Sequence, residues 1–186
     1  MLLIAPPRPE LRPQPWLRDP HLGTLPDALL TLRAGPAAPW LRYDHSITGQ
    51  LRATRGVVTI APLREGFGRP SALEAALLAT PGLRCAWLRE ITLAAGGEVM
   101  LHARTVVPKG ASKLLPALRG LGRRPLGELL FLGRALRAGV TREHRCAFRN
   151  AAGGWLRATT YRVQGDPLLV LESPTAAAID HAQGVR

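Results

Sequence analysis

Residues 83–107 read LRCAWLREITLAAGGEVMLHARTVV, and this stretch decides the fold. Its two halves, residues 83–93 and 99–107, are rich in large apolar and β-branched residues, which favour strands. Gly96 and Gly97 lie between them. A Gly-Gly pair that joins two strand-like runs is typical of a β-hairpin turn. The stretch therefore predicts two neighbouring antiparallel strands.

The rest of the chain predicts more strands. β-Branched residues favour a strand over about residues 55–64, which Gly66, Gly68 and Pro70 should end. Residues 44–48 are expected to lead into that strand. The C-terminal third predicts three further strands separated by glycine-containing turns, at residues 140–149, 155–163 and 168–172.

Short helices are expected between these strands. Ser71 followed by Glu74 has the pattern of a capping box, which predicts a helix through Leu78. The other predicted helices cover residues 27–32, 111–121 (starting near Ser112) and 126–131. Consecutive strands joined by tight turns form an antiparallel sheet on which helices pack, so the predicted fold class is α+β.

The chain is long enough for one domain. It has 186 residues, of which 46% are hydrophobic and 20% charged, a globular composition. Residues 1–24 are rich in proline and should form an irregular, extended segment. We expect a single domain over residues 25–174 and a C-terminal tail over residues 175–186.

The charge does not by itself indicate a nucleic-acid partner. The formal net charge is +12, yet the basic residues are almost all arginines scattered singly along the chain. This distribution differs from the clustered patch of a nucleic-acid-binding protein, so we expect no nucleic-acid partner. A positive field would instead steer a small anionic substrate toward its site.

Several features predict a cytoplasmic protein. The N-terminal run MLLIAPP lacks the basic leader and the long apolar core of a signal peptide, and no stretch is apolar enough to span a membrane. Only Cys85 and Cys146 are present, without the spacing of a disulfide framework or metal ligands. We interpret both as reduced packing residues.

Arg89 is the first candidate for a functional residue. Side chains alternate along a strand, so Trp87, Arg89, Ile91 and Leu93 share one face. If this face is the inner one, the guanidinium lies among apolar groups and needs a carboxylate of the protein or an anionic ligand. Alternatively, Arg89 lies at an edge and its head reaches solvent.

Glu172 is the second candidate. It ends the apolar run PLLVL, which is typical of a strand buried on both faces. A carboxylate at that position is either partly desolvated and suited to proton transfer, or it emerges into solvent. We interpret Glu65 and Glu90 as surface or ion-pair residues. The five histidines show no metal-ligand spacing, and no motif indicates a nucleophile.

Six short motifs together resemble chorismate lyases. They occur in the order and nearly the spacing of that family: DHSIT (44–48), LREGF (63–67), WLREI (87–91), RTVVP (104–108), PLGELLF (125–131) and LLVLE (168–172). Each motif alone is unspecific. The resemblance covers about residues 27–174.

The resemblance implies a fold, a reaction and site residues. It implies about six antiparallel strands flanked by helices, a fully enclosed site, no cofactor and usually a monomer. The implied reaction eliminates pyruvate from chorismate to give 4-hydroxybenzoate, the entry step to ubiquinone biosynthesis. Arg89 and the backbone N–H of Leu126 would bind the ring carboxylate, and Glu172 would meet the hydroxyl at the other end of the ring. Ile47 would line the site where the family usually has methionine, a change that its volume should allow.

An alternative of another class is a ligand-sensing effector domain that binds a small aromatic acid. Such domains of winged-helix bacterial regulators share this fold, and a fold alone does not decide function. Those regulators carry an N-terminal DNA-binding domain, whereas only a proline-rich segment precedes the expected domain here. The sequence therefore favours the enzyme.

Overall fold

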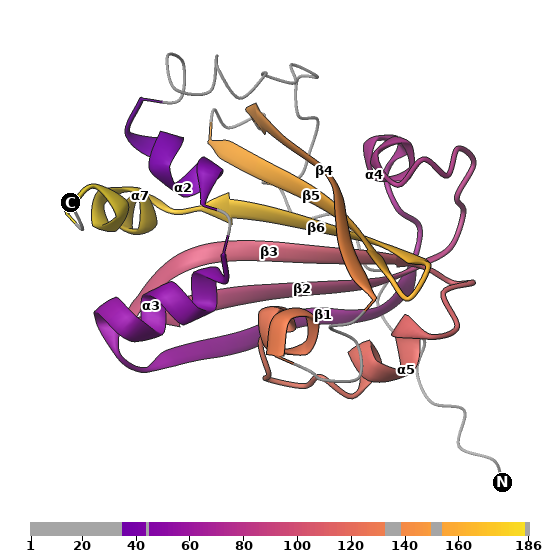
Figure 1. Ribbon diagram of the computed structural model, residues 1–186, viewed down its shortest axis with the longest axis horizontal. Coiled ribbons are helices and arrows are strands. Elements are labelled where there is room, and N and C mark those ends of the chain that lie inside the picture. Colours follow the sequence, from indigo (N-terminus) through magenta and orange to yellow (C-terminus); the bar gives the residue numbers. More distant parts are fainter. Residues whose placement is uncertain (1–34, 44, 133–138, 150–153, 185–186) are drawn as a thin grey trace, which may run out of the picture.

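The computed structural model describes residues 35–43, 45–132, 139–149 and 154–184 (Figure 1). The proline-rich segment 1–24, the helix expected at residues 27–32 and an unmatched loop near residues 134–138 lie outside the described residues. Within the described ranges, no helix has both the length and the apolar character that crossing a membrane requires.

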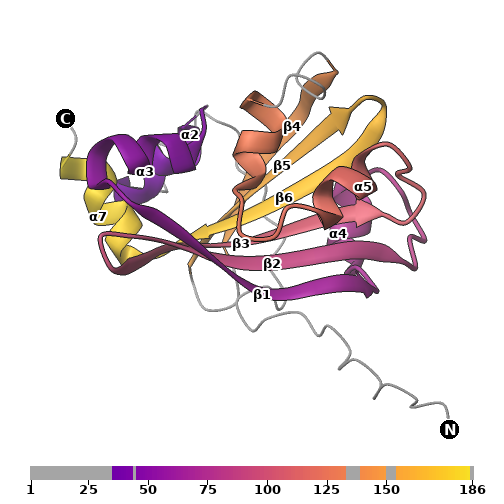
Figure 2. The ribbon, with the colours of Figure 1, turned by 90° about the horizontal axis from the view of Figure 1, so that it is seen from below.

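One antiparallel sheet forms the centre of the molecule. Its strand order is β1-β2-β3-β6-β5-β4. The strands are β1 (Val58–Gly68), β2 (Ala86–Ala95), β3 (Glu98–Pro108), β4 (Val140–Arg149), β5 (Trp155–Val163) and β6 (Asp166–Pro174). Figure 2 shows the sheet edge-on, with most helices gathered on one side of it. The predicted α+β fold, with a single sheet of about six antiparallel strands, is confirmed.

The hairpin in residues 83–107 forms as predicted. Gly96 and Gly97 have φ angles of 60° and 83°, and the pair Ala95–Glu98 closes the turn. Positive φ at both central residues gives a turn whose twist matches that of the strands, and glycine adopts it without strain. The turn therefore fixes the first pairs, Ala95–Glu98 and Ala94–Val99, after which the register shifts by one residue and Leu93 pairs with Leu101.

Short helices and turns connect and cover the strands. They are η2 (Gly35–Ala37), α2 (Ala38–Arg42), α3 (Ile47–Arg55), α4 (Ala72–Leu77), α5 (Leu114–Arg119), the π-helical turn η3 (Glu128–Leu132) and α7 (Ala176–Gly184). The capping box of α4 is confirmed: Glu74 N–H donates to Ser71 Oγ (3.1 Å), and Ser71 N–H donates to Glu74 Oε2 (2.7 Å).

The prediction that residues 44–48 lead into a strand is wrong. Ser46 caps helix α3 instead, because its Oγ accepts a hydrogen bond from Gly49 N–H (3.2 Å). Ile47 and Leu51 lie one helical turn apart and are both buried. Tertiary burial therefore outweighs the strand preference of the Ile-Thr pair.

Several predicted boundaries also differ, and two of these differences have a clear structural cause. Strand β1 does not end before Gly66, since Gly66 and Gly68 still pair with Leu88 and Ala86 of β2. Helix α5 is shorter than predicted at its start, where Asp166 Oδ2 accepts the backbone N–H groups of residues 113 and 114 (2.8 and 2.9 Å). The Asp166 side chain, from a turn far along the sequence, therefore accepts the free backbone N–H groups at the start of α5.

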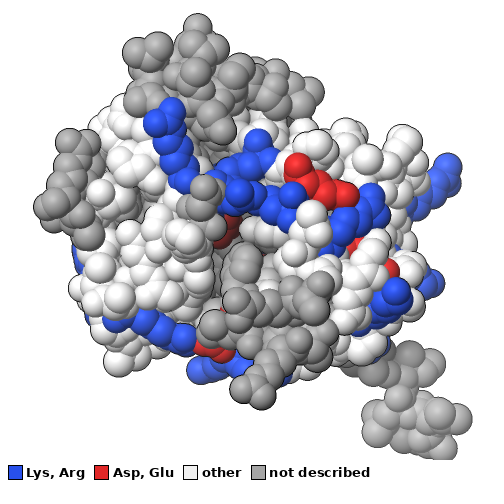
Figure 3. Space-filling model, viewed as in Figure 1, with Lys and Arg blue, Asp and Glu red and all other residues white. Residues whose placement is uncertain are grey.

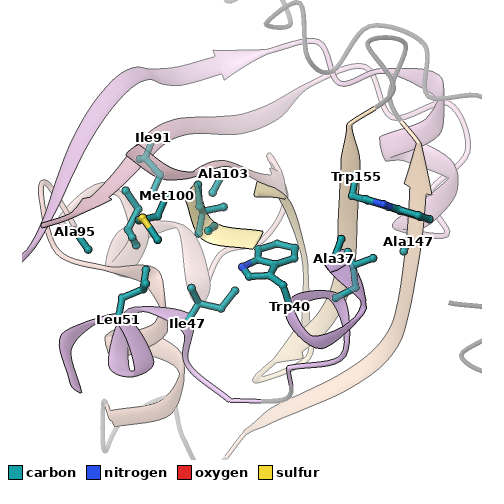
Figure 4. Close-up of a cluster of buried hydrophobic side chains, with 14 of the residues drawn as sticks. Ala37, Trp40, Ile47, Leu51, Ile91, Ala95, Met100, Ala103, Ala147 and Trp155 are labelled. Atoms are coloured by element: carbon teal, nitrogen blue, oxygen red, sulfur yellow. The ribbon is translucent and has the colours of Figure 1, made fainter. Parts of the chain in front are cut away.

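The two faces of the sheet are covered differently. On one face, helices α2, α3 and α7 close one apolar cluster, and α5 with residues 126–130 closes a second. Figure 4 shows the first cluster, where Trp40 of α2 and Ile47 of α3 point toward Ala103 of β3. The opposite face carries a third cluster that includes Leu88 and Phe148.

A group of buried charges lies on the opposite face. Arg104 donates to both carboxylate oxygens of Glu74 (2.6 and 3.1 Å) and to Glu90 Oε1 (2.5 Å). Glu90 is thus the ion-pair residue that the sequence predicted, and the group attaches α4 to β2 and β3.

The segment after residue 174 forms a packed helix. Helix α7 begins after Thr175, whose Oγ1 donates to Val99 O (2.7 Å), and it buries Ala178 against α2 and β3. His181 on the same helix lies 2.8 Å from Thr54 Oγ1 of α3. The C-terminal segment therefore closes the first apolar cluster.

Candidate functional site

A cavity lies between the two apolar clusters on the same face of the sheet. Strands β1, β2, β3, β5 and β6 line one side of it, and residues 45–48 and 125–130 line the other. Its lining comprises His45, Ser46, Ile47, Thr48, Ile60, Arg89, Ile91, Leu93, Leu101, Ala103, Thr105, Pro125, Leu126, Gly127, Leu130, Arg157, Tyr161, Val170 and Glu172. Figure 3 shows a hollow near the centre of the viewed face, with Lys and Arg side chains gathered along one side.

All four residues proposed from the sequence line this cavity. Arg89 lies on β2, Glu172 on β6, Ile47 at the first position of α3, and Leu126 directly after Pro125. These residues are far apart in the sequence, and the sheet and its covering segments bring them together.

Arg89 is buried on the inner face rather than at an edge. Its side chain is 1% exposed, and its Nη2 donates to the backbone oxygens of Gly122 (2.5 Å) and Arg124 (3.2 Å). Its Nε is buried and has no hydrogen-bond partner. Among the described residues no acceptor is found for Nη1 either, so the guanidinium keeps donors for a ligand.

Glu65 is the carboxylate that lies beside Arg89. Its Oε2 is 3.8 Å from Arg89 Nε, and the two residues pair across β1 and β2. Burial raises the pKa of Glu65, which the positive charge of Arg89 partly offsets. Burial also lowers the pKa of Arg89, partly offset by Glu65. A buried cation with one distant carboxylate is well suited to bind an anion.

Glu172 lies on β6, which β3 separates from the strand of Arg89, and it is paired with Arg157. Arg157 Nε and Nη2 both donate to Glu172 Oε2, at 2.8 and 2.6 Å. The Glu172 side chain is 16% exposed, so it is largely desolvated and does not simply emerge into solvent. No hydrogen bond to its Oε1 is found in the part of the chain that the structure describes.

Arg157 is the main residue of the cavity that the sequence analysis missed. It faces Glu172 across β5 and β6. This pairing follows from the turn at Gln164 and Gly165, because counting outward from the closing pair Val163–Asp166 reaches it after six steps. Gly165 was the visible signal of this turn, but the sequence analysis began the next strand at residue 168, whereas β6 begins at Asp166, so the predicted bounds did not give this register.

Tyr161 adds a neutral hydroxyl group to the same side. It lies on the same face of β5 as Arg157 and is partly exposed to the cavity. Burial raises the pKa of Tyr161, and the negative charge of Glu172 raises it further against the opposing arginines. Its phenol therefore stays protonated at neutral pH.

The covering segments place backbone N–H groups next to the cavity. The Ser46 side chain caps α3, whose first residues Ile47 and Thr48 line the cavity. The amide groups at a helix start favour negative charge. Glu128, which starts the turn η3, pairs with Arg52 of α3 and so links the two covering segments.

The described residues hold no evident metal centre. Within residues 35–43, 45–132, 139–149 and 154–184, no group of three His, Cys, Asp or Glu side chains could coordinate an ion. The cavity instead combines the buried guanidinium of Arg89 on β2 with the paired carboxylate of Glu172 on β6. This arrangement can bind a small carboxylate and exchange a proton with it.

The fold and cavity thus define an α+β protein with a site that mostly buried residues line and that is suited to a small anion. A family model described as chorismate lyase matches residues 25–174. A probable chorismate pyruvate-lyase of Halorhodospira halophila is 35% identical, covering 78% of this chain and 84% of that protein. A chorismate pyruvate-lyase of Escherichia coli K12 is 37% identical, covering 72% and 78%. The chain therefore belongs to the chorismate lyase family of enzymes, as its motifs predicted.

Solved structures show a weaker likeness to this chain. The effector domain of PhnF from Mycobacterium smegmatis has a TM-score of 0.49 and 14% identity, covering 72% of this chain and 90% of that chain. A possible transcriptional regulator, YydK from Bacillus subtilis, has a TM-score of 0.43 and 9% identity, covering 65% and 58%. Likeness at these values carries no argument about what the cavity binds.

Proposed function

We propose that this protein converts chorismate to pyruvate and 4-hydroxybenzoate. The observation that carries the proposal is that Ile47, Arg89, Leu126 and Glu172, chosen from sequence alone, line one cavity. The curated relatives support it, because they are named for the same substrate and one of its products.

Arg89 is proposed to bind the ring carboxylate. Its free donors face a largely desolvated cavity, where a charge-assisted hydrogen bond is strong. The backbone N–H of Leu126 is the proposed second donor to this carboxylate. Ile47 contributes an apolar contact to the ring. The backbone amide groups at the start of α3 favour the negative charge of the bound ligand.

Glu172 is proposed to act at the other end of the ring. Chorismate loses a proton from C4 while the bond between C3 and the enolpyruvyl oxygen breaks, and the ring becomes aromatic. The leaving enolpyruvate takes up a proton at carbon and becomes pyruvate. Glu172 Oε1 is the proposed general base: it accepts the proton that leaves C4, and it then contacts the hydroxyl group of the new phenol. Aromatisation makes the step strongly favourable, so binding the right conformer and moving one proton suffice.

The direct test is to incubate the purified protein with chorismate and separate the products by chromatography. We expect 4-hydroxybenzoate and pyruvate in equal amounts. Tight binding of 4-hydroxybenzoate without any turnover would contradict the proposal and favour a ligand-sensing domain. We further propose that the product feeds ubiquinone biosynthesis, which complementation of a bacterial strain that lacks chorismate lyase can test.

A further inference from the structure

The contact between Arg157 and Glu172 is one-sided. Two donors of the guanidinium, Nε and Nη2, converge on the same carboxylate oxygen, Oε2. Both residues line the cavity, and Oε1 accepts no hydrogen bond from the described residues. A fork that used both oxygens would take up one acceptor position on each of them. The observed contact occupies one oxygen and keeps the other available.

Arg157 is itself fixed from behind. Its Nη1 donates to the backbone oxygens of Trp40 (3.2 Å) and Tyr43 (2.8 Å), and its Cζ lies 4.6 Å from the centre of the Trp40 ring. The side chain is 4% exposed. Helix α2 and the residue after it therefore hold the guanidinium on one side, while Glu172 holds it on the other.

This anchoring determines the orientation of Glu172. A glutamate side chain loses considerable rotamer freedom when it is fixed, and its terminal torsion is broad without a partner. The cross-strand register brings Arg157 opposite Glu172, and the α2 carbonyls set where the guanidinium lies. The orientation of the carboxylate is thus set from α2 through Arg157.

We propose that Arg157 is a positioning residue for Glu172, and that it determines which carboxylate oxygen acts on the substrate. The inference rests on the proposed function, because it assigns Glu172 Oε1 a role in the reaction. Arg157 acts through Glu172 and not on the ring carboxylate, which Arg89 binds at the other end. Its loss therefore lowers kcat and leaves the affinity for 4-hydroxybenzoate nearly unchanged.

Arg157→Lys is the variant that tests this role. An ammonium group can reach Oε2 but cannot also span the backbone oxygens of Trp40 and Tyr43, so a positive charge remains while the orientation is lost. Because a misplacement of about 1 Å can cost roughly 100-fold in rate, we expect kcat to fall about 10- to 100-fold. The dissociation constant of 4-hydroxybenzoate should change less than about 3-fold, which corresponds to about 0.7 kcal/mol. The reason is that Arg157 contacts Glu172 and not the ring carboxylate.

A double-mutant cycle with Glu172→Gln separates positioning from a direct role. If Arg157 acts only through the carboxylate, Arg157→Lys should cost little further kcat in the Glu172→Gln background. Equal losses in both backgrounds would overturn the proposal, because they would mean that Arg157 acts independently of Glu172. A loss of 4-hydroxybenzoate affinity with unchanged kcat would overturn it too, since Arg157 would then hold the ligand itself.

Arg162→Lys is the matched control. Arg162 lies on the same strand and donates to Glu143 (2.8 Å), but this pair is partly exposed and lies outside the cavity lining. We expect unchanged kcat. Thermal unfolding shows whether Arg157→Lys folds, and if it does not, Trp40→Phe is the second variant. Trp40→Phe weakens the contact between the Trp40 ring and Arg157. We expect a few-fold loss of kcat, which should disappear when Trp40→Phe is combined with Glu172→Gln. Wild-type protein that makes no product would instead overturn the proposed function itself.

Discussion

Replacing Arg89 by alanine is the sharpest test of the cavity. The side chain is almost fully buried, and two of its hydrogen bonds hold the backbone at Gly122 and Arg124. That segment leads directly into Pro125 and Leu126. Arg89→Ala therefore removes the proposed carboxylate contact and loosens the segment that carries the second donor.

The magnitude follows from these two roles. A charge-assisted contact to a carboxylate contributes about 1.5–3 kcal/mol, and about 1.4 kcal/mol corresponds to tenfold. The contact alone predicts a fall of about 10- to 100-fold in kcat/KM, and the loosened segment adds to it. Arg89→Lys should recover little, because a point charge cannot serve both the carbonyls and a planar carboxylate.

The assay measures turnover, 4-hydroxybenzoate affinity and thermal unfolding on each variant. Glu65→Gln is the control, since it keeps the shape of the neighbouring side chain and removes its charge. We expect Glu65→Gln to bind 4-hydroxybenzoate at least as tightly as wild type, because the ligand no longer competes with the Glu65 carboxylate for Arg89. Arg89→Ala protein that unfolds more readily but retains normal kcat/KM in its folded fraction would refute the reasoning.

Four further predictions concern other parts of the molecule. Glu172→Gln should lower kcat more than 4-hydroxybenzoate affinity, which calorimetry and steady-state kinetics together measure; an equal loss of both would contradict proton handling. Burial raises the pKa of Cys146 from 9.0 to about 11, so at pH 8 iodoacetamide should alkylate it about 100-fold more slowly in the folded than in the urea-unfolded protein, as mass spectrometry can show. Arg104→Met leaves the carboxylates of Glu74 and Glu90 buried without their cation, which should cost about 3–5 kcal/mol in denaturant unfolding, and a loss below about 1 kcal/mol would be incompatible with the buried group. Treatment with EDTA should leave turnover unchanged, and activity that returns only with a divalent ion would disprove the proposed mechanism.

Local signals predicted much of the fold. The Gly96-Gly97 turn determined both hairpin strands, and the alternation along β2 correctly put Arg89 and Ile91 on one face. The capping box at Ser71 identified the start of α4. These features depend on residues close together in sequence, so pattern and propensity suffice.

Predictions failed where distant residues decide the outcome. Ser46 could precede either a strand or a helix, and burial of Leu51 under the first apolar cluster favours the helix. The start of α5 depends on Asp166, about fifty residues further along the chain. Arg157 became recognisable only once the register of β5 and β6 was known. Each of these needs a long-range contact that no local window contains.

Two buried arginines on neighbouring strands, Arg104 and Arg89, are paired differently, and this difference supports the assignment of the site. Arg104, one strand away from Arg89, donates from all three of its nitrogens to Glu74 and Glu90, so the protein itself neutralises that charge. Within the described part of the chain, Arg89 has two backbone carbonyls and Glu65 at 3.8 Å, and no acceptor is found there for its Nε. Burying a cation is costly unless it is paired, and the same sheet pairs one arginine fully while it leaves the other incomplete. The incomplete arginine faces the cavity, so a ligand carboxylate is the group that would complete it.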